Sequence, residues 1–292
     1  MQRVRVGLIG RNIGASRSPW MHEREGAAQG IDLSYELFDF AASGQDESSL
    51  ESKLEQLQQR GYAGVNVTYP YKQSVIAHLD HLSDGARRVG AVNTIQLCPA
   101  GRIGYNTDVT GFSLSMQQGL PGAGMGRVLQ MGAGGAGAAT AQALLDMGVG
   151  ELLICDFDSG RATALVARLA EQHSSQRVAV CTDVAAALRG ADGLVNATPM
   201  GMHSHPGSPI DVALLDSRLW VADIVYFPLE TALLAAARAV GCRTLDGGGM
   251  AVHQAAAAFE IFTGRRVDVE RMRRSFGEFS LAKHPGRAEA PA

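Results

Sequence analysis

Short polar side chains and one amine lie in two tight turns near the N-terminus. Ser16 and Ser18 stand one residue apart, before Pro19, in the stretch GRNIGASRSPWMHE at residues 10–23. Lys72 ends the stretch NVTYPYK, after a run of strand-forming residues. A hydroxyl donates hydrogen bonds to anions, and an amine can hold or transfer a proton. The two turns therefore indicate a site for a small polar ligand at which a proton can move.

A glycine-rich motif lies near the middle of the chain. In VLQMGAGGAGAAT the glycines follow the spacing G-x-G-x-x-G, directly after an apolar strand and at the start of a helix. This context favours a dinucleotide site, because small residues let the backbone approach a pyrophosphate and a helix N-terminus supplies N–H donors. A tight turn without a ligand is the alternative interpretation. We expect the cofactor to contact Gly132, Ala133, Gly134, Gly135, Ala136 and Gly137.

An acidic residue ends the next expected strand, ELLICD. Asp156 lies 19 residues after Gly137. A carboxylate at this point accepts hydrogen bonds from the adenosine ribose and repels a 2′-phosphate, which predicts NAD rather than NADP as the cofactor. A helix N-cap is the alternative role for Asp156, although Asp158 or Ser159 could fill that position instead. We include Asp158 and Arg161 among the expected cofactor contacts.

Composition and charge narrow the classes of function. The chain has 292 residues, 46% of them hydrophobic and 19% charged, values typical of globular proteins with about two domains. The net charge of −3, without a basic block, argues against nucleic acid or an anionic membrane as partner. No apolar stretch suits a signal peptide or a membrane span, and four scattered cysteines are typical of reduced thiols. We expect a cytoplasmic monomer or homodimer without a metal site.

Strand and helix patterns alternate along the whole chain, which predicts an α/β fold. The first strand is expected at residues 3–10, and a helix follows at 18–30 with Ser18 as its N-cap. The stretch at 73–82 is expected to be helical. After a Gly/Pro-rich break at 120–126 the pattern restarts as a run of βα units, which predicts a parallel, doubly wound sheet of the Rossmann type.

These patterns divide the chain into two expected domains and a tail. The second domain carries the glycine-rich motif and would bind the dinucleotide. The predicted boundaries are 1–112 for the first domain, completed by a C-terminal helix at 247–282, then 113–246 for the Rossmann domain and 283–292 for a flexible tail.

Seven sequence blocks carry a family resemblance that extends to about residue 282. In chain order they are SRSP, NVTYPYK, GAVNT, NTD, the glycine loop, NATPMGM and GMAVHQA. In these blocks the chain resembles the shikimate/quinate dehydrogenases. The resemblance implies a small polyol carboxylate as substrate, bound by the N-terminal α/β domain, which would also carry the catalytic residues. It also implies an oxidoreductase that transfers a hydride from the C3 hydroxyl of shikimate, quinate or both to the nicotinamide of NAD.

The resemblance also implies roles for single residues. The hydroxyls of Ser16 and Ser18 would hold the substrate carboxylate. Further substrate contacts would come from Thr68, Asn93, Tyr226 and Gln254, and contacts near the nicotinamide from Thr198, Ile224, Gly247 and Met250. NADP-using relatives have Asn-Arg-Thr where this chain has Asp-Phe-Asp at residues 156–158, which supports NAD.

Lys72 and Asp108 would handle the proton that leaves the C3 hydroxyl when it is oxidised. If Lys72 is enclosed by the protein, its neutral form is favoured, and Lys72 would take the proton while Asp108 orients the Lys72 amine. The carboxylate of Asp108 favours the ammonium form instead, and the pair would then act as a unit that stabilises the developing alkoxide. Both mechanisms are compatible with the sequence.

Two other functions are compatible with the sequence. An enzyme of the same fold could oxidise an amino-substituted shikimate, because a hydroxyl-to-amine exchange needs only local changes. A non-catalytic protein that senses a dinucleotide is the second, although the polar set Lys72, Asn93, Asp108 and Gln254 favours an enzyme. The histidines of HSHP, residues 203–206, are interpreted as loop residues, since no acidic or cysteine partner lies at ligand spacing.

Overall fold

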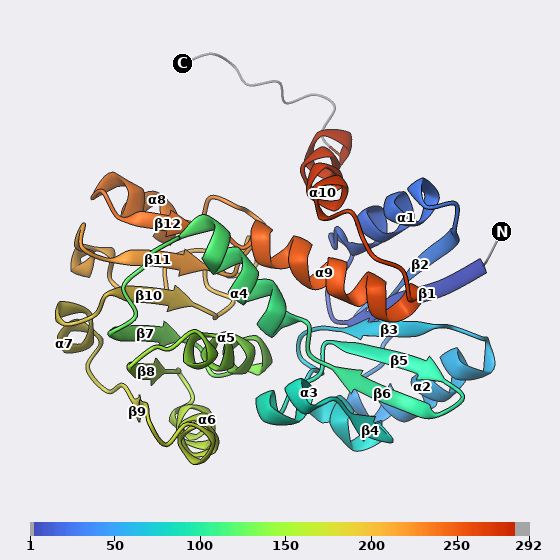
Figure 1. Ribbon diagram of the computed structural model, residues 1–292, viewed down its shortest axis with the longest axis horizontal. Helices are drawn as coiled ribbons and strands as arrows, with labels where there is room; N and C mark the ends of the chain where they lie inside the picture. The colour runs from blue at the N-terminus through green and yellow to red at the C-terminus, as the bar shows by residue number, and fades with distance from the viewer. Residues whose placement is uncertain (1–2, 284–292) are drawn as a thin grey trace. The chain divides into compact units, whose positions relative to one another are not determined.

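Two α/β units, each built on a six-stranded sheet, make up the chain (Figure 1). The computed structural model describes the backbone of residues 3–283 and the side chains of residues 3–279. Within these limits unit 1 comprises 3–83, 92–107 and 255–283, and unit 2 comprises 84–91 and 108–254. The α/β fold class is confirmed. No helix within residues 3–283 is both long and apolar enough to cross a lipid bilayer.

The sheet of unit 1 mixes parallel and antiparallel strands. Its strands are β1 (Arg3–Gly10), β2 (Asp32–Asp39), β3 (Gly64–Val67), β4 (His81–Leu82), β5 (Thr94–Cys98) and β6 (Gly101–Tyr105). They lie in the order β2-β1-β3-β5-β6-β4. β1 pairs in parallel with β2 and β3, and β5 runs antiparallel to β3 and β6. The carboxyl ends of β1, β2, β3 and β6 and the amino end of β5 therefore share one edge.

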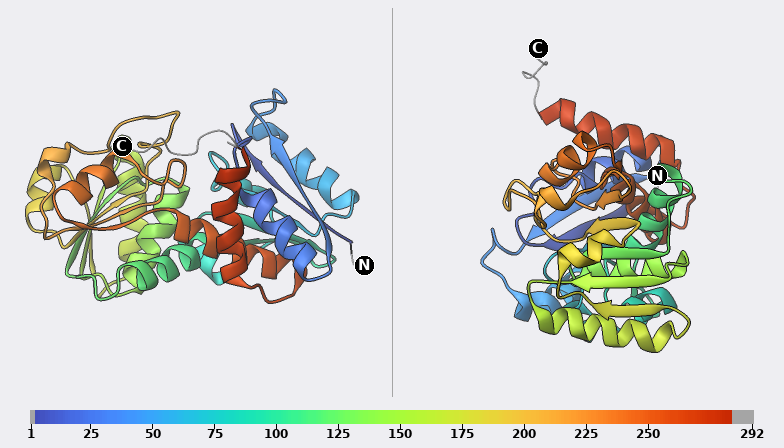
Figure 2. Two further views of the ribbon diagram at one scale, coloured as in Figure 1. Left: turned by 90° about the horizontal axis from the view of Figure 1, so that it is seen from above. Right: turned by 90° about the vertical axis from the view of Figure 1, so that its left-hand side faces the viewer.

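Helices cover the sheet of unit 1. Its helical elements are α1 (Ser18–Ala28), η1 (Glu47–Ser49), α2 (Leu50–Gln59), η2 (Ser74–His78), the second half of α9 (Gly248–Thr263) and α10 (Val269–Lys283). Three leucines of α2 at helical spacing, Leu50, Leu54 and Leu57, are fully buried, as expected for an amphipathic helix. The helices α1 and α10 lie side by side (Figures 1 and 2).

Three expectations for these helices are wrong. The N-cap of α1 is Arg17, whose backbone already has a helical conformation (φ −87°, ψ −7°), so Ser18 is the first helical residue and its amide donates to the Ser16 hydroxyl at 3.3 Å. The stretch at 73–82 forms the short η2 and the strand β4, whose pairing with β6 overrides local helix propensity. The expected single helix at 247–282 is two helices, separated after Gly264, whose φ is +67°. The expected tail, 283–292, lies outside the described residues apart from Lys283.

The sheet of unit 2 is entirely parallel. Its strands are β7 (Arg127–Met131), β8 (Glu151–Cys155), β9 (Arg177–Val180), β10 (Gly193–Asn196), β11 (Trp220–Asp223) and β12 (Arg243–Leu245). Their order is β12-β11-β10-β7-β8-β9. The chain moves outward from β7 to β9 and then returns to the other side of β7 at β10. The sheet is therefore parallel and doubly wound, as predicted from the βα pattern, and its switch point lies between β7 and β10.

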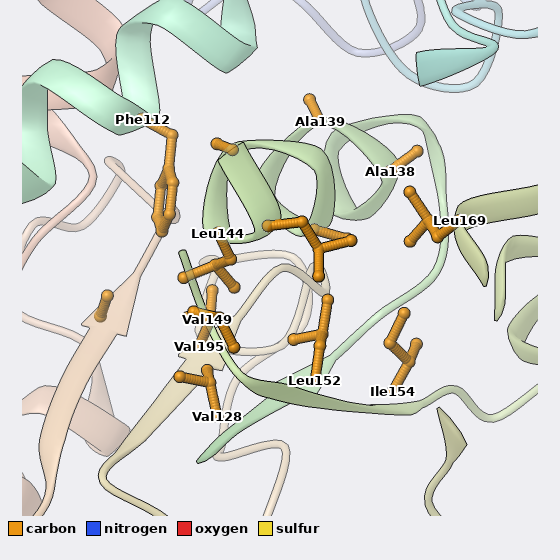
Figure 3. Close-up of a cluster of buried hydrophobic side chains, with 14 of the residues drawn as sticks. Phe112, Val128, Ala138, Ala139, Leu144, Val149, Leu152, Ile154, Leu169 and Val195 are labelled. Atoms are coloured by element: carbon orange, nitrogen blue, oxygen red, sulfur yellow. The ribbon is translucent and has the colours of Figure 1, made fainter. Parts of the chain in front are cut away.

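Helices cover both faces of the unit 2 sheet. They are α3 (Asp84–Val89), α4 (Asp108–Gly119), α5 (Gly135–Asp146), α6 (Ser159–Gln172), α7 (Val184–Arg189), η3 (Val212–Leu214), α8 (Ala232–Ala239) and the first half of α9. Along each strand successive side chains point to opposite faces. Val128 and Leu152 therefore join the buried cluster beneath α4, α5 and α6 (Figure 3), whereas Leu129 and Leu194 join a second cluster with α7 and α8.

Candidate functional site

Ser16 and Ser18 lie just beyond the carboxyl end of β1. The Ser16 amide donates to the carbonyl of Ile13 at 2.9 Å, which closes a turn, and the Ser16 hydroxyl oxygen accepts from the Ser18 amide at 3.3 Å. Both serines are half-buried. A hydroxyl that accepts one hydrogen bond keeps its own proton for donation. The turn can therefore present Ser16 as a donor to an anion.

The loop after β3, which carries Thr68 and Lys72, lies against the loop after β1. The Thr68 amide donates to the Ile9 carbonyl at 2.9 Å. Gly10 allows this approach, because a Cβ at its position would lie 2.4 Å from the Thr68 methyl group. Lys72 is half-buried, and its carbonyl accepts from the Val92 amide at 2.7 Å. The sheet thus places Thr68 and Lys72 on the same edge as the serines.

Asn93 reaches this edge from the antiparallel strand β5, which it precedes. It is buried, and its carbonyl accepts from the Val67 amide at the end of β3 at 2.8 Å. Its side chain exchanges two hydrogen bonds with Thr107, one from Nδ2 to the threonine hydroxyl and one from the threonine amide to Oδ1, both 2.8 Å long. Ser16, Ser18, Thr68, Lys72 and Asn93 are therefore brought to one edge of unit 1.

The other expected catalytic and substrate residues belong to unit 2. Asp108 is buried and is the first residue of α4. Tyr226 is exposed in the loop after β11. Gln254 lies on α9, where its side-chain amide donates to the Ala251 carbonyl at 3.0 Å. The pairing of Asp108 with Lys72 remains a prediction.

The structure explains why glycine occupies each of the three fixed positions of the G-x-G-x-x-G motif. Gly132 has a φ of +105°, a region that L side chains rarely adopt. A Cβ at Gly137 would lie 2.2 Å from the Gly132 carbonyl oxygen, so only glycine permits this close packing. Gly134 is the N-cap of α5, and a Cβ there would meet no protein atom within 4 Å. The open space at Gly134, in front of a helix N-terminus, fits the approach of a pyrophosphate.

The side chain of Gln130 forms hydrogen bonds to the backbone of this glycine loop, a role that was not predicted from the sequence. The residue is fully buried in β7. Its Nε2 donates to the carbonyls of Gly132 at 2.9 Å and Gly137 at 2.8 Å, and its Oε1 accepts from the Thr140 hydroxyl at 2.9 Å. A buried amide with satisfied partners fixes the surrounding backbone. The available signal was one amide side chain among the apolar residues 128–131 of the strand.

Asp156 lies next to the glycine loop, and Asp158 takes the helix cap. The Asp156 carboxylate accepts from the Ala133 amide at 2.6 Å and from the Asp158 amide at 2.9 Å. Asp158 is the N-cap of α6, where it accepts from the amides of Gly160 and Arg161 and lies 3.4 Å from the Arg161 Nε. Since carboxylate oxygens accept several hydrogen bonds, Asp156 retains capacity for ribose hydroxyls.

A buried network joins the loops after β10 and β11. Asn196 donates through Nδ2 to the Asp223 carboxylate at 2.9 Å, and its Oδ1 accepts from the Thr198 hydroxyl at 2.7 Å. Asp223 also accepts from the Thr231 hydroxyl at 2.8 Å and the Val225 amide at 3.0 Å. Burial raises the pKa of Asp223, against the effect of these hydrogen bonds. The network fixes Thr198, and Asp223 is a second residue that sequence reasoning missed.

The expected nicotinamide-side residues meet beyond β11. A Cβ at Gly247 would lie 2.4 Å from the Ile224 carbonyl oxygen, so the two backbones are in close contact. The Ile224 amide donates to the Asn196 carbonyl at 3.0 Å, and Ile224 packs in the same apolar cluster as Met250. The HSHP segment lies in the loop after β10. The loops after β7, β8, β10 and β11 thus meet at the carboxyl edge of the sheet, where open α/β sheets bind ligands.

Comparison with known proteins gives consistent matches over nearly the whole chain. Residues 8–95 match the shikimate dehydrogenase substrate binding domain, and residues 247–275 match the shikimate 5′-dehydrogenase C-terminal domain. The shikimate dehydrogenase (NADP+) of Streptomyces avermitilis is 47% identical over 94% of this chain and 95% of its own length. The quinate/shikimate dehydrogenase (NAD+) of Corynebacterium efficiens is also 47% identical, over 94% of this chain and 97% of its own length.

A solved structure extends the match to three dimensions. Quinate dehydrogenase from Corynebacterium glutamicum in complex with NAD superimposes with a TM-score of 0.88 and 45% identity, over 95% of this chain and 100% of that chain. The resemblance inferred from the seven sequence blocks is therefore confirmed, and the relatives are oxidoreductases, as expected. The chain belongs to the shikimate dehydrogenase family.

Proposed function

We propose that the protein oxidises the C3 hydroxyl of shikimate, quinate or both to the 3-dehydro acid, with NAD+ as hydride acceptor. Relatives named for NAD+ and for NADP+ are equally similar to the chain. The observation that carries the choice of NAD+ is Asp156, whose carboxylate lies 2.6 Å from the Ala133 amide of the glycine loop. A 2′-phosphate on the adenosine ribose would meet this negative charge.

Unit 1 provides the groups that suit a polyol carboxylate. The hydroxyls of Ser16 and Ser18 would hold the carboxylate through charge-assisted hydrogen bonds. Thr68 and Asn93, on the same edge, would bind ring hydroxyls. In unit 2 the loop from Gly132 to Gly137 would hold the pyrophosphate. We assign the substrate to unit 1 and the dinucleotide to unit 2 on this basis.

Lys72 is the residue proposed to handle the proton. When bound, the oxidised nicotinamide accepts a hydride at its C4 atom, and the hydroxyl oxygen of the substrate must lose a proton as the hydride leaves carbon. The Lys72 Nζ would take this proton, or would stabilise the developing alkoxide as a unit with Asp108. Lys72 is half-buried on the edge that carries Ser16 and Thr68, which supports either role.

Lys72→Met tests this assignment. We expect turnover to fall on the order of 10²–10⁴-fold, the range typical for a general acid–base group, while binding of the acid is largely retained. Lys53→Met is the matched control, because Lys53 is also half-buried but lies on α2, where its amine donates to the Gln56 side chain at 3.1 Å and lies over the Phe38 ring. NADH absorbance, followed with shikimate and quinate and with both dinucleotides, gives the rates. Turnover of the Lys72→Met variant close to that of wild type would exclude Lys72 as the proton-handling residue.

A further inference from the structure

Asp39, the last residue of β2, binds four backbone amides through its side chain. Oδ1 accepts from the amides of Asn12 at 3.0 Å, Ala41 at 3.0 Å and Ala42 at 3.4 Å, and Oδ2 accepts from the amide of Ile13 at 3.0 Å. Two of these donors belong to the loop after β1 and two to the loop after β2. One half-buried carboxylate therefore joins two loops at the edge of unit 1.

This carboxylate is ionised, and it stabilises an unusual backbone conformation. Burial raises the pKa of Asp39, but the amide hydrogen bonds outweigh burial and hold the pKa below its ordinary value. Asn12 has a φ of +56°, in the left-handed region that few residues other than glycine adopt. Consecutive amides around such a residue form a concavity that suits an anion. The Asp39 carboxylate fills this concavity and so holds the loop in its turn.

The same loop leads directly to the serines. Beyond Ile13 the chain turns through the hydrogen bond from the Ser16 amide to the Ile13 carbonyl, 2.9 Å long. The Ser16 hydroxyl then accepts from the Ser18 amide at 3.3 Å, where α1 begins. Each of these hydrogen bonds restrains the next part of the loop. Asp39, by holding Ile13, therefore fixes the start of the turn that carries Ser16 and leads into Ser18.

We propose that Asp39 is a positioning residue for the acid-binding serines, holding the loop after β1 so that Ser16 and Ser18 meet the substrate carboxylate in a fixed geometry. The proposal rests on the proposed function, in which these serines bind the carboxylate. Asp39 itself does not contact the substrate in this assignment. Its effect is confined to the affinity for the acid, because the dinucleotide is assigned to unit 2.

The primary test is Asp39→Asn, which keeps the side-chain shape but places an NH₂ group against one of the amides. We expect the KM for the acid to rise on the order of tenfold, with the KM for NAD+ unchanged, since only the acid-binding geometry is altered. Asp32→Asn is the matched control, because Asp32 lies exposed at the opposite end of the same strand. Unchanged KM for the acid in Asp39→Asn would overturn the proposal.

A double-mutant cycle separates positioning from general destabilisation. If Asp39 acts through the serine turn, Asp39→Asn should raise the KM for the acid much less when Ser16→Ala is already present. Additive effects would overturn the proposal, and so would an equal rise in the KM for NAD+. Asp39→Glu, which keeps the charge, should restore part of the affinity. A wild-type protein that oxidises neither acid would refute the proposed function itself, an outcome distinct from an active enzyme that is insensitive to Asp39.

Discussion

Replacing Gly134 with alanine should separate folding from cofactor binding. A Cβ at Gly134 meets no protein atom within 4 Å, and its φ of −73° is ordinary for any residue. Alanine lowers the entropy of the unfolded chain, which raises the free energy of unfolding by about 0.4–1 kcal/mol. It is also a poorer N-cap than glycine, which lowers the free energy of unfolding by a similar amount. We therefore expect the free energy of unfolding to change by less than about 1 kcal/mol.

The same methyl group would occupy the space through which a pyrophosphate approaches the helix N-terminus. Loss of one hydrogen bond between a backbone amide and a charged group costs about 1.5–3 kcal/mol, which corresponds to a roughly ten- to hundredfold increase in the Kd for NAD+. Gly137→Ala should behave differently. Its Cβ would lie 2.2 Å from the Gly132 carbonyl oxygen, so the loop itself must shift and stability must fall together with affinity.

Isothermal titration with NAD+ and thermal unfolding of each variant measure the two effects separately. Gly277→Ala is the control, because Gly277 lies within α10 with no atom within 4 Å of its Cβ position. It should raise stability by up to about 1 kcal/mol through helix propensity and leave NAD+ binding unchanged. If Gly134→Ala bound NAD+ as tightly as wild type, the glycine loop would not be the pyrophosphate site.

Two further changes test the cofactor choice and a buried histidine. The double variant Asp156→Asn with Phe157→Arg should raise kcat/KM for NADP+ relative to NAD+ on the order of a hundredfold, since contacts between like charges cost several kcal/mol. The Phe157 side chain is fully exposed, so its replacement loses no packing. An unchanged ratio of the two kcat/KM values would refute the role of Asp156. Burial lowers the pKa of His22 from 6.5 to about 3. As the pH drops below 6.5, His22 is therefore protonated in the unfolded chain but not in the folded chain, and the free energy of unfolding falls. His22→Leu should therefore reduce the stability lost between pH 7.5 and pH 5, measured by urea unfolding, by about 2 kcal/mol, whereas an equally steep loss would contradict this.

The sequence predicted those parts of the fold that depend on local chemistry. The apolar strand RVLQM followed by small residues predicted β7, the glycine loop and α5, and the structure places them at 127–131 and 135–146. Gly132 and Gly137 were recognisable from the G-x-G-x-x-G spacing, and the structure shows why both are glycine: a positive φ at Gly132 and close packing at Gly137. A parallel, doubly wound sheet followed from the repeated βα units, although no strand order was predicted.

The errors arose where distant contacts decide the local structure. The pair His81–Leu82 forms β4 only because β6 offers it a parallel partner, and nothing within residues 73–82 indicates that pairing. Ser18 is a residue type that favours the N-cap, but the helical backbone conformation already begins at Arg17, which the sequence around Ser18 does not indicate. The one amide inside its strand marked Gln130, but its partners could not be assigned from the sequence, because two are carbonyl groups of the loop and the third is the hydroxyl of Thr140, ten residues further along the chain.

Acidic residues at strand ends show why position could be predicted but partners could not. Asp39, Asp156 and Asp223 each end or directly follow a strand, so the sequence presents three similar patterns. In the structure each carboxylate binds the neighbouring parallel strand or its loop: Asp39 the loop after β1, Asp156 the loop after β7 at Ala133, and Asp223 the end of β10 at Asn196. Strand order therefore selects the loop that each acid holds. A sequence analysis that commits to a strand order can assign these partners, because parallel neighbours bring their carboxyl ends to the same edge.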